Sequence, residues 1–296
     1  MPGPWSEFFP THKKFTGYLK LVKARYRFHD YISLSTRGPV WRSGYQSRLS
    51  SLRNKHKGQR CFVMGNGPSL QQMDLSPLAN EITIGANGIY KKFPEWGFHT
   101  NYLVMEDVEQ TEIRGPEMDK VKGPLKLFAI DTAHAVASDI NTLFFYTPRG
   151  HNRNYYWSAP FYPQFSLDFA ALVHLGSTVT HAMLQLAYHL GCDPIYIIGV
   201  DHNYSSLTDV FPPGKVTITQ DNIHLTKGLH ADPNYYKIGD VIGVPHYQRQ
   251  EAAYQKARDV LESNGRRILN AGLDSKLNVF EKTSYDSIFN KSKPES

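Results

Sequence analysis

Four polar side chains each follow a short apolar run, and together they could hydrogen-bond a ligand. Each run has the composition of a buried strand and is followed within two positions by an asparagine or an aspartate. The four residues are Asn66, Asn87, Asp107 and Asp201. Such a residue alone usually belongs to a turn or a helix cap. Four of them suggest one binding edge, because ligands of parallel α/β sheets bind at the carboxyl ends of the strands.

The turn after the first of these runs has the composition of an anion-binding site. Two glycines permit backbone angles that other residues resist, and the proline after them has the φ of a first helical turn. A serine that can cap the following N–H groups completes the motif. We therefore predict that a phosphate binds at Gly65, Asn66, Gly67 and Ser69. The motif is neither GxGxxG nor a Walker loop, and an ordinary strand-to-helix turn is the alternative.

Acidic and histidine side chains add two further hypotheses. Glu106 precedes Asp107, and two carboxylates at a strand end could hold Mg²⁺ or Mn²⁺. The alternative is that they cap a helix, and we favour a metal-independent site. Histidine suits general-base catalysis because its pKa lies near neutral pH. Our candidates for the base are His246, at the start of an amphipathic helix, then His230 and His202.

Alternating strand and helix patterns predict an α/β fold with a Rossmann-like, doubly wound parallel sheet. Apolar runs predict strands near residues 61–64, 81–88, 102–105, 125–129, 142–146, 195–200 and 267–270. Helical spacing of apolar residues predicts helices over 177–190 and 247–264.

Composition divides the chain into an N-terminal appendage and a main domain that contains a lid. Residues 1–55 form a basic, aromatic N-terminal appendage, and residues 56–290 form the main Rossmann-like domain. Within that domain, residues 203–245 lose periodicity and are rich in Pro, Gly, His and Tyr. A stretch of this length is usually a lid or disordered, and we predict a lid over the carboxyl ends of the strands.

Charge and cysteine content restrict the setting of the protein. The net charge is +6, and much of the excess lies in the appendage, which suits an anionic membrane surface or packing on the main domain. We expect no nucleic-acid partner, and a homo-oligomer is compatible with the sequence. Two cysteines, Cys61 and Cys192, are expected to be buried thiols rather than a disulfide framework. We expect a cytoplasmic protein, peripheral on the inner membrane face, without a signal peptide or spanning helix.

Two motifs carry a family resemblance. The turn at residues 65–70 and the strand at 195–201, which continues into His-Asn-Tyr, resemble the bacterial CMP-sialic-acid-dependent sialyltransferases of the single Rossmann-domain type. Residues 54–289 resemble even more a related prokaryotic family, long described as a domain of unknown function. That family includes motility-associated flagellin glycosyltransferases and an archaeal hydroxymethylpterin pyrophosphokinase.

The resemblance implies roles for individual residues. It implies nucleotide binding by Gly65, Asn66, Gly67, Ser69, Asn87, Ser177, Thr178 and Asp201, with the segment from Ser177 to Thr180 at the cytosine base. It implies substrate contacts by Asp107, His202, Asn203 and Tyr235. Tyr204, with either Tyr236 or Tyr235 as the second tyrosine, would stabilise the leaving phosphate, and His246 holds the position of the base. Asn203 occupies the place of the first of the two expected tyrosines.

These observations favour an inverting glycosyltransferase that uses a nucleotide-activated sugar. The first choice of donor is a CMP-linked nonulosonic or ketodeoxy sugar, with a surface glycan such as capsule or lipopolysaccharide, or a protein, as acceptor. One alternative is a pyrophosphokinase that acts on a pterin with ATP, although the glycine turn lacks a Lys/Arg cluster for a triphosphate. The other is a nucleotide-binding module without catalysis.

Overall fold

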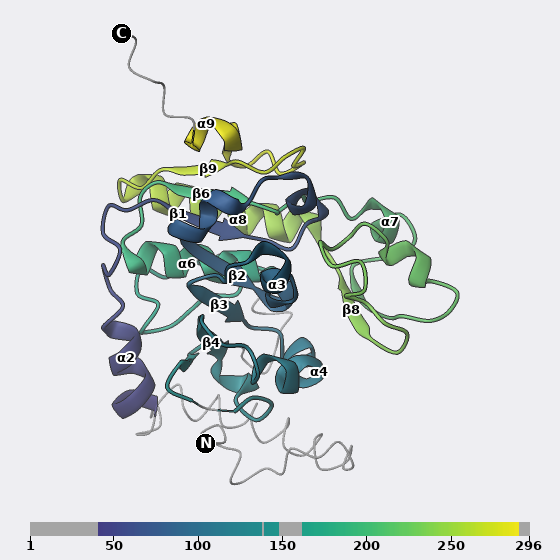
Figure 1. Ribbon diagram of the computed structural model, residues 1–296, viewed down its shortest axis with the longest axis horizontal. Helices are drawn as coiled ribbons and strands as arrows, with labels where there is room; N and C mark the ends of the chain where they lie inside the picture. Colours follow the sequence, from purple (N-terminus) through teal and green to yellow (C-terminus); the bar gives the residue numbers. More distant parts are fainter. Residues whose placement is uncertain (1–40, 138, 148–161, 290–296) are drawn as a thin grey trace.

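The computed structural model describes residues 41–137, 139–147 and 162–289, and its centre is a parallel sheet of eight strands (Figure 1). The strand order is β10-β9-β6-β1-β2-β3-β4-β5, and every neighbouring pair is parallel. The strands are β1 (Cys61–Met64), β2 (Ile82–Ala86), β3 (Tyr102–Met105), β4 (Leu125–Ala129), β5 (Thr142–Phe145), β6 (Ile195–Ile198), β9 (Ile268–Asn270) and β10 (Glu281–Lys282). The order reverses between β1 and β6, which makes their carboxyl ends the expected ligand site. The predicted α/β fold class is confirmed.

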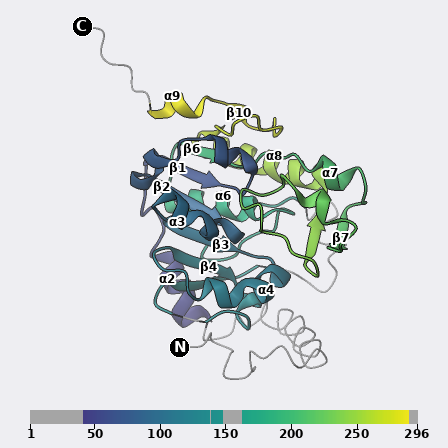
Figure 2. The same cartoon turned by 45° about the vertical axis from the view of Figure 1, so that its right-hand side comes forward.

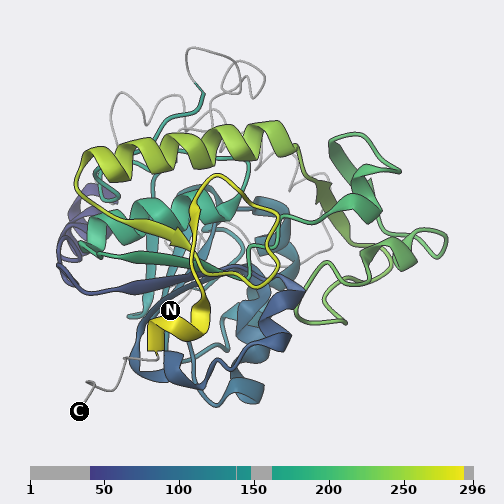
Figure 3. The same ribbon diagram turned by 90° about the horizontal axis from the view of Figure 1, so that it is seen from above.

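Both faces of the sheet are covered, so the inner strands β1 and β3 and the edge strand β5 are buried throughout. On one face α6 (Val179–Leu190) and α8 (Tyr247–Ser263) lie side by side, as Figure 3 shows. The other face is covered by η2 (Pro68–Gln72), η3 (Ser76–Asn80), η4 (Asn87–Lys92), α3 (Phe93–Trp96), α4 (Val108–Met118), η5 (Ile130–Thr132) and α9 (Tyr285–Phe289). Because side chains alternate along a strand, Val63 packs on the α6 side and Phe62 on the α4 side.

Both predicted helices are present with the expected ends. Thr178 caps α6 by accepting a hydrogen bond from the N–H of Thr180, and Gly191 ends the helix in the left-handed conformation. α8 begins at Tyr247, directly after His246. The buried thiols are also confirmed, since Cys61 and Cys192 are free and lie in the core.

Part of the predicted N-terminal appendage packs into the main domain. The segment includes η1 (Trp41–Gln46) and α2 (Ser47–Ser50), and the side chains of Leu49 and Leu52 are buried in the main core. Residues 1–40, which carry most of the predicted basic and aromatic surface, lie outside the described residues. No helix among the described residues is long and apolar enough to span a membrane.

The predicted lid is an ordered segment with a small core of its own. It contains α7 (Ser205–Thr208), β7 (Gly214–Thr217), η6 (Ile223–Thr226) and β8 (Val241–Val244), and β7 pairs with β8 in antiparallel fashion. Leu207, Ile218, Leu229 and Ile242 form its buried cluster. Figures 1 and 2 show this segment beside the main sheet, next to the start of α8. The loss of periodicity in the sequence therefore does not mean a lack of structure, since this segment has short helices, a strand pair and its own core.

Candidate functional site

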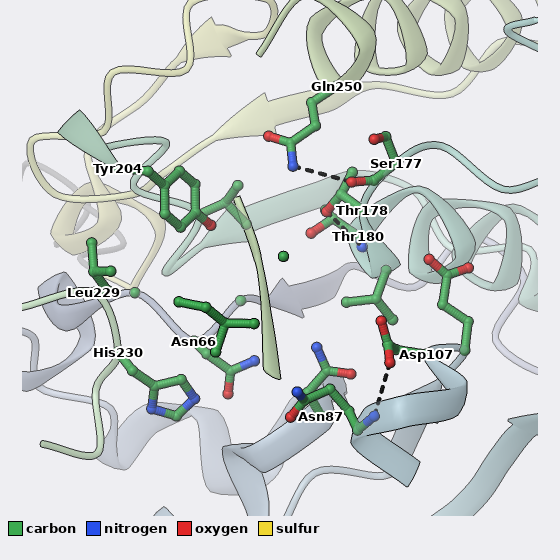
Figure 4. Close-up of a pocket in the computed structure, with 18 of the residues that line it drawn as sticks. Asn66, Asn87, Asp107, Ser177, Thr178, Thr180, Tyr204, Leu229, His230 and Gln250 are labelled. Carbon is green, nitrogen blue, oxygen red and sulfur yellow. Dashed lines mark hydrogen bonds between the residues drawn. The ribbon is translucent and has the colours of Figure 1, made fainter. Parts of the chain in front are cut away.

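A cavity of about 410 Å³ lies where the carboxyl ends of the central strands meet the lid. Its wall includes residues that follow β1, β2, β3 and β6, the start of α6, and residues of the lid and of α8. In Figure 4, Asn66, Asn87 and His230 lie opposite Ser177, Thr178 and Gln250. The volume is in the range of small-molecule sites, about 300–1,000 Å³.

Asn66 lines this cavity, and the orientation of its side-chain amide is fixed. Its Nδ2 donates to the backbone oxygen of Ala86 at 3.0 Å, which sets the orientation of the amide. Its Oδ1 is buried and has no hydrogen-bond partner among the described residues. A buried oxygen without a partner costs free energy, and a ligand hydroxyl or amine would supply the missing donor.

Unusual backbone angles concentrate around the same cavity. Asn87, Ser177 and His202 line it and have φ angles of 52°, 60° and 54°. Among the described residues only two other non-glycine residues, Asn54 and Asp274, have positive φ. Such backbone conformations cost energy and tend to cluster at functional sites. Asn87 also has a buried Oδ1 without a partner in the described part of the chain.

The glycine turn does not hold its N–H groups ready for a phosphate. The Ser69 N–H donates to Oδ2 of Asp201 at 2.9 Å, and the Ser69 hydroxyl donates to the same carboxylate. The Gly67 N–H donates to the Gly199 oxygen at 2.7 Å. A Cβ on Gly67 would lie 2.4 Å from Cγ of Asp201, so only glycine allows this approach.

Asp201 therefore occupies the position at which we expected a phosphate. Burial raises the pKa of this carboxyl group, while its hydrogen bonds from Ser69 act in the opposite direction. Neither Ser69 nor Asp201 is among the described residues that line the cavity, whereas Gly65 and Gly67 are. The expected anion-binding role of Ser69 does not fit this geometry.

His230 has a defined protonation geometry. Its Nδ1 accepts a hydrogen bond from the N–H of Asp232 at 2.9 Å, so the neutral ring must carry its proton on Nε2. Nε2 is buried and has no partner among the described residues. Burial lowers the pKa of His230 to about 3, which keeps the ring neutral at pH 7. Since the ring presents an N–H and no lone pair, the base role considered for His230 does not fit the structure.

His202 has the opposite arrangement. Its Nε2 faces Oε1 of Glu251 at 3.2 Å, and because a carboxylate only accepts, this nitrogen carries the proton. The lone pair is then on Nδ1. The ring packs edge-on against Tyr247 at 4.8 Å and contributes to the cavity wall. Burial lowers the pKa of His202, and Glu251 acts against that shift.

The remaining candidate base and the predicted substrate residue Asn203 lie elsewhere. His246 stands at the N-terminal end of α8, where its side chain makes no capping hydrogen bond. Asn203 accepts a hydrogen bond from Nζ of Lys276 at 3.0 Å on the exposed surface. Neither is among the described residues of the cavity wall.

All three predicted tyrosines line the cavity. Burial raises the pKa of Tyr204, Tyr235 and Tyr236, so their hydroxyl groups stay protonated and can donate hydrogen bonds. The Tyr235 hydroxyl lies 3.4 Å from Oε1 of Gln110. The Tyr235 hydroxyl thus donates within the protein, and the phenols of Tyr204 and Tyr236 can offer neutral donors to a ligand.

The acidic residues are also at the cavity, and one of them caps a helix. Asp107 accepts a hydrogen bond from the N–H of Gln110 at 2.8 Å and caps α4, as the helix-cap alternative predicted. Glu106 lines the same wall. The described residues contain no group of three His, Cys, Asp or Glu side chains that could hold a metal ion. Mg²⁺ often needs only one or two carboxylates beside ligand phosphates, so this pair could still bind it with a nucleotide.

Sequence reasoning missed several residues of the cavity wall. They are Gln110, Lys215, Leu229 and Gln250. Gln250 donates to the Ser177 oxygen at 3.1 Å and thereby joins α8 to the start of α6. The signal for Gln250 was available, because this polar residue falls on the face of α8 that buries Ala253 and Ala257.

Comparison with known proteins gives one family and one structural likeness. Residues 42–206 match the family described as "6-hydroxymethylpterin diphosphokinase MptE-like". No curated protein matches. Among solved structures, the chain is similar to the Maf glycosyltransferase of Magnetospirillum magneticum AMB-1, with 12% sequence identity and a TM-score of 0.47. That likeness covers 82% of this chain but only 38% of the Maf chain.

The family match includes β1 to β6, the glycine turn and most of the strand ends that form the cavity. The resemblance predicted from the sequence is thereby confirmed. Because the match spans more than half of the chain, the protein belongs to the 6-hydroxymethylpterin diphosphokinase MptE-like family.

Proposed function

We propose that the protein is a transferase that takes its donor group from a nucleotide and that the donor binds in the cavity at the strand ends. The observation that carries this proposal is a set of buried, unpartnered polar atoms on residues that line the cavity. These atoms are Oδ1 of Asn66, Oδ1 of Asn87 and Nε2 of His230, and none has a partner among the described residues. A nucleotide carries hydroxyl donors and phosphate acceptors that complement such a wall.

Glycosyl transfer is the reaction we favour, with a CMP-linked sugar as the first donor to test. In an inverting transfer, an acceptor oxygen forms a bond to the anomeric carbon while the bond from that carbon to the phosphate oxygen breaks. The nucleotide leaves with the electron pair, and the acceptor proton goes to a base. His202 suits this role because its Nδ1 carries the lone pair while Glu251 holds the other nitrogen. Neutral phenols such as Tyr204 can donate to the leaving phosphate without a metal ion.

Diphosphate transfer from ATP is the second candidate, and the family description favours it. Here a hydroxyl oxygen of the acceptor forms a bond to the β-phosphorus of ATP while the bond from that phosphorus to the α-phosphate oxygen breaks. AMP leaves with the electron pair, and the hydroxyl proton goes to a base. The charge of a triphosphate usually requires Mg²⁺, and Glu106 and Asp107 are the wall carboxylates that could help bind it. In the glycosyl-transfer proposal, the acceptor is a glycan or a protein. The same proposal includes attachment of the protein to a membrane surface.

A thermal-shift panel with CMP, UDP, GDP and ATP, each with and without Mg²⁺, separates these candidates. Ligand binding raises the melting temperature by mass action, and we expect CMP to do so without Mg²⁺. Asn66→Ala should lower CMP affinity about 5- to 150-fold, which corresponds to the loss of one hydrogen bond to a buried group. Asn203→Ala is the matched control, because this exposed residue is not among the described residues of the wall. Stabilisation by Mg²⁺–ATP alone would favour the diphosphokinase, and no stabilisation by any nucleotide would reject the proposal.

A further inference from the structure

We propose that His230 is the residue that recognises a phosphate of the ligand, as a neutral hydrogen-bond donor held in place by a stack with Tyr235 and Arg114. This inference rests on the proposed nucleotide-dependent function. It assigns to the lid a binding role, and it gives His230 a role other than that of a base.

The hydrogen bonds at the His230 imidazole have a defined direction. The Asp232 N–H can only donate, so Nδ1 of His230 must accept, and Nε2 is left with the proton. The residue is 8% exposed, and its Nε2 has no partner among the described residues. A buried N–H donor at a cavity wall calls for an acceptor.

The His230 ring is held in place by stacking. His230 stacks on Tyr235 with a centroid distance of 3.7 Å and an interplanar angle of 4°. The guanidinium of Arg114 lies 3.8 Å from the same Tyr235 centroid. The two groups cannot share one face of the ring at these distances, so Tyr235 lies between them. A donor fixed in this way loses little conformational entropy on binding.

Residues of the main domain hold this stack in place. Arg114 belongs to α4, is 3% exposed, and donates to the Tyr235 backbone oxygen at 3.0 Å and to Oε1 of Gln110 at 3.1 Å. On the η4 side, a Cβ on Gly88 would lie 2.0 Å from Cε2 of Tyr235, so glycine is needed for the ring to fit. Arg114 is thus a positioning residue for His230.

Charged side chains surround the His230 ring. Burial is the main reason for the low pKa of His230; the Asp232 carboxylate raises the pKa, and the positive charges of Arg114 and Lys91 lower it. Nζ of Lys91 lies 5.9 Å from the Tyr235 centroid and 4.0 Å from Asp232, and Arg114 lies 3.9 Å from Asp240. Both cations are paired with carboxylates, Lys91 with Glu117 and Asp232, and Arg114 with Asp240. An anionic oxygen is still the preferred acceptor, because a hydrogen bond to an ionised oxygen is stronger than one to a neutral oxygen. A phosphate oxygen of the nucleotide meets this requirement.

The protonation state can be tested without any ligand. Long-range ¹H–¹⁵N NMR of histidine-labelled protein distinguishes the two tautomers, and His230→Gln assigns the signal. We expect a neutral ring with the proton on Nε2 that does not titrate between about pH 5 and 8, the range in which an ordinary histidine changes charge. A proton on Nδ1, or a titration midpoint near the ordinary value, would overturn the proposal whatever the function of the protein.

The binding role is tested by comparing a nucleotide with its nucleoside by isothermal titration calorimetry. For CMP and cytidine, His230→Phe should lower CMP affinity about 10- to 100-fold, the loss expected for a hydrogen bond to a charged group. Cytidine affinity should stay within about twofold, because the phenyl ring keeps the stack but offers no donor. His230→Gln, whose amide can donate, should recover part of the loss. His224→Phe, on an exposed lid residue outside the described cavity wall, is the matched control.

Further arms cover the positioning residue and a nucleotide other than CMP. Arg114→Lys keeps the positive charge but removes the planar guanidinium. This variant should lower the ratio of CMP affinity to cytidine affinity and shift the His230 Nδ1 resonance. A general loss of fold stability would not produce these two changes. Pyrophosphate is the probe that needs no nucleotide, and it should shift the Nε2–H signal of His230. If no nucleotide binds but pyrophosphate gives this shift, the nucleotide proposal fails and the phosphate site stands. Equal losses of CMP and cytidine affinity in His230→Phe, or no response to nucleotide or pyrophosphate, would overturn the inference.

Discussion

Two groups of polar side chains lie at the carboxyl edge of the same sheet, and they differ in where their hydrogen-bond partners come from. In the Ser69–Asp201 pair, the carboxylate accepts from the N–H and hydroxyl of Ser69, so the protein supplies both sides of each bond. In the open group, formed by Asn66, Asn87 and His230, a buried polar atom of each residue lacks a partner in the described chain.

This difference separates two roles for similar residues. A buried polar group that the fold already satisfies stabilises the fold, and a ligand would have to break those bonds to use it. A buried polar group without a partner costs free energy until a ligand supplies one. We therefore interpret the Ser69–Asp201 pair as structural and the open group as the ligand-binding surface.

The largest expected effect concerns the proton acceptor beside the open group. His202→Ala should lower turnover about 10²- to 10⁴-fold, the usual contribution of a general base, and should leave nucleotide binding nearly unchanged. The measurement is the rate of nucleotide release from the donor identified in the panel. His246→Ala, outside the described cavity wall, should keep its turnover. The reverse result would make His246 the base, as the sequence resemblance implied.

The pH dependence of the same reaction sharpens this assignment. Only neutral His202 can accept a proton, so turnover should fall as the pH drops through its pKa, which burial holds below the ordinary value of 6.5. Glu251→Gln removes the carboxylate that raises this pKa. The midpoint of the acid limb should therefore move to lower pH in Glu251→Gln. An unchanged midpoint would exclude His202 as the group that controls the rate.

The next effect tests the structural half of the comparison. Asp201→Ala leaves the Ser69 N–H without its acceptor and should lower the free energy of unfolding by about 1–3 kcal/mol, with nucleotide affinity nearly unchanged. Asn87→Gly is the opposite case, because glycine accepts the φ of 52° at this position while the amide is lost. It should weaken nucleotide binding and leave stability nearly unchanged. Urea unfolding and calorimetry measure both quantities, and equal behaviour of the two variants would remove the distinction.

The smallest expected effect is the contribution of His230 to acid stability. Its pKa is lowered to about 3 in the folded protein, whereas the unfolded chain should titrate near 6.5. Protons then bind more readily to the unfolded chain. The contribution of neutral His230 to the free energy of unfolding is therefore fully present above about pH 6.5 and is lost as the pH falls from there towards 3. His230→Gln removes this contribution and should reduce the stability loss between pH 7.5 and 5 by about 1–2 kcal/mol. The wild-type slope should persist in part, since burial also lowers the pKa of His174 and His181 to about 4. An unchanged slope would contradict the low pKa of His230.

The lid shows why part of the fold was not predictable. Its core residues, Leu207, Ile218, Leu229 and Ile242, are spaced by about a dozen positions, so they leave neither a helical nor a strand period in the sequence. The strands of the main sheet are local apolar runs buried on both faces, and for that reason the sequence predicts them closely, as with β1 and β3.

The candidate site divides along the same line. Local sequence determined that Asn66, Asn87 and Asp107 follow strands. The parallel sheet then placed them at one edge, because the carboxyl ends of parallel strands lie at the same edge of a sheet. Tertiary structure decided which polar groups are satisfied. Asp201 reaches Ser69 across 132 residues, and Arg114 reaches the lid at Tyr235 across 121 residues. Hydrogen-bond partners depend on distances of a few ångströms between segments that are far apart in the chain, so residue types and spacing alone could not show which side chains remain open to a ligand.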